Sequence, residues 1–201
     1  MPPPNDATSD SLDRVAGFVA FATGGTLGLV QDLTHAVLES IGDMEGADPE
    51  VVAEESLCLV AVATARAAEV GLADEPDRRP SIVRTLLDLP FTYRDYLLGK
   101  AMIEDDRPEL SEMADEVRER LRRKREFYTT HLPEGQFPGP HALGDKMELW
   151  MGRVSPPKLP ETPQERLESL GLVAPTVAHL KLILAYGQRG APPLGHNGGI
   201  E

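Results

Sequence analysis

A long helix that is apolar on almost every side constrains the fold of this chain more than any other feature. Asp48 is a typical N-cap residue, and Pro49 follows it at the first helical position. The helix is predicted to reach Gly71, and nearly every side chain between Leu57 and Ala68 is apolar. A helix with so little polar surface has to be surrounded by other elements. We therefore expect the chain to build its core around this segment.

Three further segments show the three-and-four spacing of apolar residues that is typical of helices. They cover residues 9–41, 80–103 and 108–130. We expect Gly24-Gly25 to kink or split the first segment, and Pro90 to kink or divide the second, because proline lacks an N–H donor and crowds the preceding turn. The third segment has one narrow apolar stripe, which predicts packing against one partner helix. The stripe consists of Leu110, Ala114, Val117, Leu121 and Tyr128.

The chain carries no signal for β-structure. No pair of alternating apolar segments is joined by the turn residues of a hairpin, and Asn197-Gly198 lies in the tail without a strand pattern around it. We predict an all-α fold, with a helical bundle-like domain followed by a Pro/Gly-rich, partly helical C-terminal arm. The predicted parts are a disordered N-terminal tail (1–8), a helical body (9–131), an extended arm with short helices (132–188) and a flexible C-terminal tail (189–201).

The arm begins where the composition changes, after His131. Ten of the 18 prolines and ten of the 18 glycines follow that residue. Thr162 opens a capping box, and Leu143, Met147 and Trp150 fall on one helical face. Because short helices cannot bury their apolar faces alone, a partner or the protein's own body must cover them. The short helices are predicted at about 141–151, 162–170 and 174–186.

Charge and composition indicate the surroundings of the chain. A net charge of −13 disfavours nucleic acid as a partner. The first residues show no basic region followed by an apolar stretch, so we expect a cytoplasmic protein. Val15–Gln31 is an uncharged stretch that is barely long enough to cross a bilayer and is rich in glycine, so no membrane role is expected. The single Cys58 lies in an apolar run and is expected to be a buried, unreactive thiol.

The fourth predicted helix separates its charges along the sequence. Glu104–Glu116 holds seven acids and one base, whereas Val117–Arg125 holds six bases and one acid. This order suits the helix macrodipole, and Glu116 with Arg120 and Glu119 with Arg123 are spaced for ion pairs within the helix. A self-paired helix face is therefore the simplest interpretation. The alternative is that Arg118–Arg125 docks on phosphates or on an acidic partner.

None of the short motifs carries a reaction. Gly24–Gly28 is glycine-rich but lacks the lysine of a phosphate-binding loop. Ser155 and Lys158 have the sequence spacing of a Ser-x-x-Lys motif, in which the serine is the nucleophile. The two prolines between them work against the helical turn that this chemistry requires.

Histidines and carboxylates offer two candidates for a metal site. Asp32, His35 and Glu39 fit one half of a di-metal bundle, but the second carboxylate–histidine copy is missing. His131 and His141 flank one loop, with a spacing less regular than that of zinc motifs. We therefore expect no metal and no cofactor. The third ligand of the second candidate would be Glu134 or Asp145, and the remaining histidines, His179 and His196, are interpreted as ordinary surface or pocket residues.

These features favour a non-catalytic helical interaction or structural subunit of a larger protein assembly. The helical body would be the anchor, and the arm would reach along a protein partner or a second copy of the chain. The aromatic cluster Phe91, Tyr93 and Tyr96 is expected to close the core, although tyrosine is also a typical interface anchor.

The alternative is a small helical enzyme or ligand sensor with a metal or small-molecule pocket between helices. Three or more ionisable groups from distant segments around one shielded cavity or ion would favour it. The pocket would be lined by His35, Glu39, Glu54 and Glu55, or by His131 and His141.

Overall fold

The computed structural model describes residues 6–42, 48–104 and 110–192, and within these ranges the fold is all-α, as expected. Seven helices and no strand are found in the described residues. The expected tails fall largely on residues 1–5 and 193–201, which lie outside the described residues, as does His196. The helices are α1 (Asp6–Ile41), α2 (Pro49–Gly71), α3 (Arg79–Glu104), α4 (Leu110–His131), α5 (Pro140–Val154), α6 (Pro163–Leu170) and α7 (Val173–Arg189).

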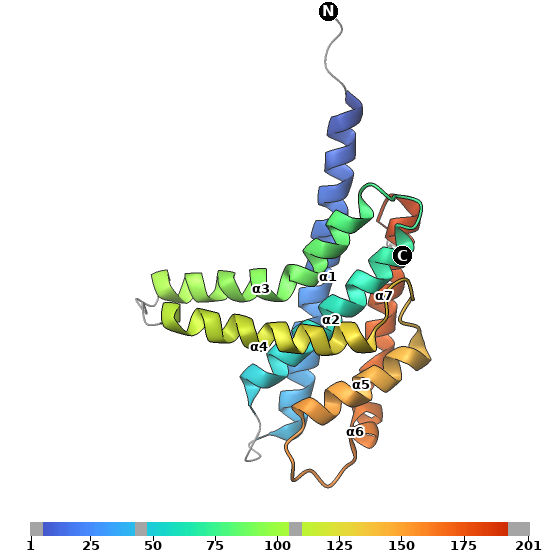
Figure 1. Cartoon of the computed structure of the whole chain (residues 1–201). Coiled ribbons are helices and arrows are strands. Elements are labelled where there is room, and N and C mark those ends of the chain that lie inside the picture. Colours follow the sequence, from blue (N-terminus) through green and yellow to red (C-terminus); the bar gives the residue numbers. More distant parts are fainter. Residues whose placement is uncertain (1–5, 43–47, 105–109, 193–201) are drawn as a thin grey trace, which may run out of the picture.

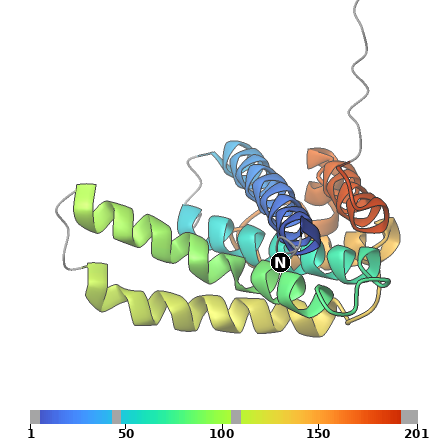
Figure 2. The same ribbon diagram turned by 90° about the horizontal axis from the view of Figure 1, so that it is seen from above.

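The central helix is α2, and the sequence predicted its bounds and its burial. The Asp48 carboxylate accepts hydrogen bonds from the N–H groups of Glu50 at 2.9 Å and Val51 at 3.4 Å. Every residue from Glu54 to Ala68 is buried. Helices α1, α3, α4, α5 and α7 all pack against α2 (Figures 1 and 2). The expectation that this helix is surrounded is confirmed.

The expected break at Gly24-Gly25 is wrong, because α1 is one continuous helix (Figure 1). Buried side chains lie on both sides of the glycine pair, from Phe18 and Ala22 to Leu29 and Leu33. Each helical glycine costs about 1 kcal/mol relative to alanine. Burying a continuous apolar stripe outweighs that local cost.

Pro90 lies inside α3, which bends midway along its length but continues as one helix (Figure 1). The expected kink is therefore observed, and a division into two helices is not. All the buried side chains of α3 lie between Ile82 and Pro90. Beyond the bend, α3 lies beside α4 and projects from the body as a helical hairpin (Figures 1 and 2).

Helix α4 packs against both α2 and α3 rather than against one partner helix. Its predicted stripe is buried only in the C-terminal part, at Val117, Leu121 and Tyr128. Leu110 and Ala114 are only half-buried, because they lie in the first turns of α4, at the outer end of the hairpin. Helix α3 runs beside α4, whereas α2 covers α4 only over the C-terminal part where the two helices cross.

The Pro/Gly-rich C-terminal segment is partly helical, and its helices pack back onto the protein's own body. Helix α7 lies against α2 and α1, and α5 lies against α2. The capping box at Thr162 is present, with Glu165 donating its backbone N–H to the Thr162 hydroxyl oxygen at 3.3 Å. The predicted face of α5 is buried through Leu143, Met147 and Trp150. The protein's own body covers these apolar faces.

No single described helix is long and apolar enough to cross a membrane. Helices α6 and α7 taken together have the length and apolar composition of a membrane span, but they are bent by 69° relative to each other. In the present fold, Leu180 and Ile183 of α7 are fully buried in the core.

Close approach of α2 and α7 depends on two glycines that face each other. A Cβ atom on Gly187 would lie 2.7 Å from the carbonyl carbon of Gly71, and one on Gly71 would lie 2.9 Å from the Leu184 carbonyl oxygen. Backbone atoms cannot move aside as a flexible side chain can. Side chains at these positions would therefore push the two helices apart.

Gly187→Ala is expected to lower the free energy of unfolding by about 1–3 kcal/mol, because overpacking outweighs the better helix propensity of alanine. Gly144→Ala in α5 is the matched control, since a Cβ atom there meets nothing within 4 Å. The control should raise stability by up to about 1 kcal/mol. Urea denaturation of both variants tests this, and equal effects would contradict the close contact.

Candidate functional site

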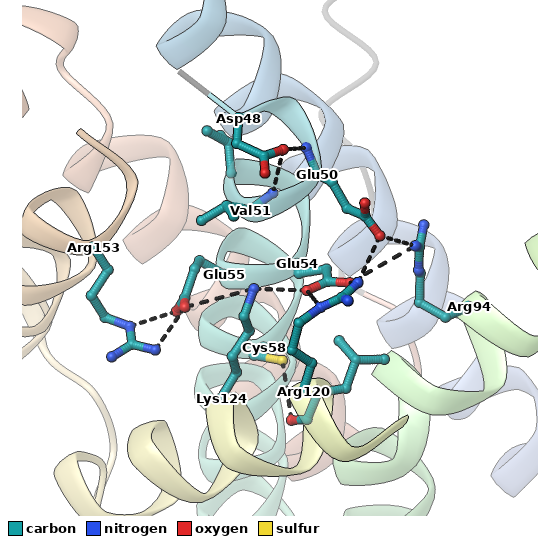
Figure 3. A network of polar contacts seen from close by, with 12 residues as sticks. Asp48, Glu50, Val51, Glu54, Glu55, Cys58, Arg94, Arg120, Lys124 and Arg153 are labelled. Carbon is teal, nitrogen blue, oxygen red and sulfur yellow. Dashed lines mark hydrogen bonds and ion pairs between the residues drawn. The ribbon is translucent and has the colours of Figure 1, made fainter. Parts of the chain in front are cut away.

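Two neighbouring glutamates are buried in the central helix. The side chains of Glu54 and Glu55 are 1% and 3% exposed. A buried carboxylate costs several kcal/mol unless cations and hydrogen-bond donors surround it. The partners come from α3, α4 and α5, so that four helices meet at this point (Figure 3).

Glu54 is held by two cations of α4. Arg120 donates from Nη2 to Oε1 at 2.8 Å and from Nε to Oε2 at 3.1 Å. Lys124 donates from Nζ to Oε2 of Glu54 at 2.7 Å. Glu50 extends the network one turn along α2, because its Oε1 accepts from both Arg120 and Arg94 at 2.7 Å (Figure 3).

Glu55 is held mainly from α5. Arg153 donates from Nε and Nη2 to the two carboxylate oxygens, both at 2.7 Å. The Tyr128 hydroxyl donates to Oε2 at 2.8 Å, and Lys124 Nζ lies 3.8 Å from Oε1. The Arg153 guanidinium also stacks 4.3 Å above the ring of Phe127, which fixes its orientation.

The electrostatics keep this network charged. Burial raises the pKa of Glu54, but hydrogen bonds from Arg120 and Lys124 outweigh it, and the pKa lies below its ordinary value. Hydrogen bonds to Glu54 and Glu55 raise the pKa values of Arg120 and Arg153. A carboxylate with a lowered pKa and several donors accepts hydrogen bonds but is a poor general base at neutral pH.

A cavity of about 590 Å³ opens beside this network, between α1, α2 and α3. Glu54 and Arg94 line it from the network, and Asp32 and His35 line it from α1. Ionisable groups from three distant segments therefore border one cavity, but the exposed side chains of Asp32 and His35 leave it open to solvent, so the shielded cavity that would favour a ligand pocket is formed only in part. Of the four residues expected around such a pocket, His35 and Glu54 line this cavity.

The other two expected pocket residues lie elsewhere. Glu39 lies with Oε1 3.2 Å from Nε2 of His35, and both side chains are exposed. Glu55 binds Arg153 on the α5 side of α2, because consecutive residues of a helix point in different directions. The sequence could propose both glutamates but could not tell which of them borders open space.

The basic segment of α4 is fully paired. Glu119 pairs with Arg123 at 2.9 Å as expected, whereas Arg120 reaches across to α2 and not to Glu116.

The remaining bases of this segment also have carboxylate partners. Arg118 pairs with Asp95 at 2.6 Å, and Arg125 pairs with Asp88 at 2.8 Å. Arg122 contacts Glu119 and Glu126, and Lys124 contacts Glu54 and Glu55. Each base from Arg118 to Arg125 has a carboxylate partner, but among these described residues only Arg122 and Arg123 pair within α4, so the expected self-paired face is present only in part.

The predicted histidine pair is not assembled into a cluster. His131 lies with Nδ1 2.7 Å from the Phe127 carbonyl oxygen, at the end of α4. His141 and Asp145 line a second pocket of about 520 Å³ between α5, α6 and the start of α7, which His131 does not line. Among the described residues, no three His, Cys, Asp or Glu side chains are grouped as a metal ion would require.

Cys58 is buried, as the sequence predicted. Burial raises the pKa of its thiol, and the nearby Glu55 carboxylate raises it further. Because the thiolate is the reactive form, this residue has no nucleophilic role in the folded protein.

His179 was interpreted from the sequence as an ordinary residue, but the structure places it where α1, α2 and α7 meet. Its Nε2 lies 3.1 Å from the Thr64 hydroxyl and 3.4 Å from the Thr26 hydroxyl. Gly25 leaves room for the ring, since a Cβ atom there would lie 2.7 Å from it. No local sequence pattern indicates this contact, because its partners are more than 100 residues away along the chain.

Comparison with known proteins gives no relationship for this chain: no family model, no curated protein and no solved structure matches it.

Glu54→Gln is expected to lower the free energy of unfolding by about 3–5 kcal/mol, because it leaves the buried ammonium of Lys124 poorly compensated. Adding Lys124→Met should recover part of the loss. Glu119→Gln removes the exposed contacts to Arg122 and Arg123 and should cost far less, because water screens ion pairs at the surface. Denaturation of the three variants checks this, and similar losses for Glu54→Gln and Glu119→Gln would show that the buried pair is not special.

His179 predicts a pH dependence of stability. Burial lowers its pKa to about 4 from 6.5, so the unfolded chain takes up a proton at a higher pH than the folded protein. Its contribution is therefore fully present above pH 6.5 and is lost as the pH falls toward 4. Between pH 7 and pH 4 the wild type should lose about 3 kcal/mol relative to His179→Gln, measured by denaturation. Parallel pH curves would contradict the buried neutral imidazole.

Proposed function

We propose that this protein is a non-catalytic interaction subunit that contacts its partner with the α3/α4 hairpin, and not with its C-terminal segment. The observation that carries the proposal is the apolar surface of the hairpin. Ile103 is 84% exposed, Tyr96 is 64% exposed and Met113 is 45% exposed. Large apolar side chains that gather on one projecting element are typical of protein interaction sites.

The exposed residues of α3 share one helix face. Tyr96 and Ile103 are seven residues apart, which corresponds to about two helical turns. No residue of α3 beyond Pro90 is buried. The hairpin extends beyond the rest of the body in both views (Figures 1 and 2), so a partner could approach it from several sides.

The hairpin is held in a fixed orientation at its base. Arg118 of α4 binds Asp95 of α3 through two nitrogen atoms, at 2.6 and 3.1 Å. Arg125 reaches Asp88 at 2.8 Å and stacks 4.6 Å above the ring of Phe91. A surface that is already ordered loses less entropy on binding.

Charge indicates the chemistry of the partner. The sequence from Glu104 to Glu116 holds seven acids and one base. A protein surface with basic residues around apolar pockets would complement it. A second copy of this chain is a poorer fit, because its net charge is −13 and the bases of Arg118–Arg125 are already paired.

A photo-crosslinking amino acid at Ile103 tests the proposal in the cells from which the chain comes. We expect one defined crosslinked protein with a basic surface. Placing the same group at Leu182, which is 44% exposed on α7, provides the matched control and should give no such product. A crosslink of equal yield from Leu182, or only a homodimer from Ile103, would contradict the proposal.

The purified complex allows a quantitative test. Tyr96→Ser with Ile103→Ser should weaken binding by about tenfold or more, because exposed apolar anchors are removed without touching the core. Leu182→Ser should leave the affinity unchanged. Affinity should also fall as salt is raised, since the acidic stretch Glu104–Glu116 contributes charge attraction. Thermal unfolding should be similar for all the variants, and unchanged affinity of the double variant would exclude the hairpin as the contact.

A further inference from the structure

The cavity between α1, α2 and α3 has the size and lining of a small-molecule site. Its volume of about 590 Å³ lies within the range of ligand pockets, roughly 300–1,000 Å³. Its apolar walls include Leu38 of α1, Leu57 of α2 and Leu97 of α3. Such a space suits the apolar part of a ligand, and the few polar groups around it would select the head group.

Arg94 is the cation that faces this cavity. Its Nη2 donates to Glu50 at 2.7 Å and lies 3.8 Å from Glu54, while its Nε is buried without an acceptor in the described residues (Figure 3). The side chain remains 22% exposed. A guanidinium carries five N–H donors, so Arg94 can bind a further acceptor without releasing Glu50.

The glutamates of the polar network number one fewer than its cations, and the carboxylate of Asp48 also acts on Arg120. The glutamates are Glu50, Glu54 and Glu55, and the cations are Arg94, Arg120, Lys124 and Arg153. Among these cations, Arg94 is the one that lines the cavity. Bidentate contact with Arg120 and a bond from Lys124 already satisfy Glu54. Asp32 lines the cavity from an exposed position on α1, where water screens its charge.

We infer that this cavity binds a small organic anion with an apolar body, of which a medium-chain aliphatic carboxylate is the simplest example. The carboxylate would bind the Arg94 guanidinium, and the hydrocarbon chain would lie between α1 and α3 over Leu57. Charge-assisted hydrogen bonds to arginine are among the stronger contacts that a carboxylate can make. This inference does not depend on the hairpin acting as a docking element.

The chain offers a matched pair of variants that separates binding from folding. Gly28 lines the cavity, whereas Gly24 lies one turn earlier on α1 and does not line it. A Cβ atom meets nothing within 4 Å at either position. Leucine at either position should preserve the fold, because it forms helices better than glycine does. Only Gly28→Leu should fill the cavity.

Isothermal titration calorimetry with decanoate, decylamine and decanol tests the inference on the full chain. We expect one decanoate per chain, with decylamine and decanol bound at least about tenfold more weakly. Gly28→Leu should abolish decanoate binding, Gly24→Leu should leave it unchanged, and Arg94→Gln should weaken it by about tenfold or more. Arg84→Gln, at an exposed arginine of α3, is the charge control and should have no effect.

Three results would overturn the inference. The first is no decanoate binding up to about 1 mM, and the second is equal affinity for decanoate and decylamine. The third is unchanged decanoate binding by Gly28→Leu. Thermal unfolding of each variant confirms that a loss of binding is not a loss of folding.

Discussion

The structure depends on neutralising two carboxylates inside its central helix. Glu54 and Glu55 are buried next to each other in α2, and neither could be tolerated there without cations. Those cations stand on α4 and α5, at positions that must lie opposite the glutamates. Apolar packing alone would allow helices to slide along α2, whereas paired buried charges favour one register. In this protein, the ion pairs therefore act as alignment points between helices.

Alignment of α4 explains the shape of the molecule. Arg120, Lys124 and Tyr128 are spaced four residues apart, so that they face α2 together. With this part of α4 held on α2, the preceding turns extend past the body. Pro90 bends α3 so that its second half follows α4 outwards (Figure 1). The part of α3 that follows Pro90 also lines the cavity beside α1, through Tyr93, Arg94 and Leu97.

The individual helices could largely be predicted from the sequence. The bounds of α2, the kink at Pro90 and the capping box at Thr162 follow from residues that are near one another in the chain. The prediction of a break at Gly24-Gly25 was wrong, because the burial of α1 against its neighbours outweighed the low helix propensity of glycine. Candidate site residues were recovered only in part. Glu54 and His35 could be proposed from their chemistry, whereas Arg94, Arg153 and His179 could not, since their partners lie far along the sequence.

The sequence by itself determined that the chain is helical, that α2 is central and that Cys58 is buried, because apolar periodicity and capping act over a few residues. Only the tertiary structure decided that Arg120 binds α2 and not Glu116, and that α5 and α7 cover their apolar faces on their own body. Ion pairs and close contacts depend on distances of a few ångströms between segments that meet only after folding. Those distances are set by packing, which no local pattern encodes.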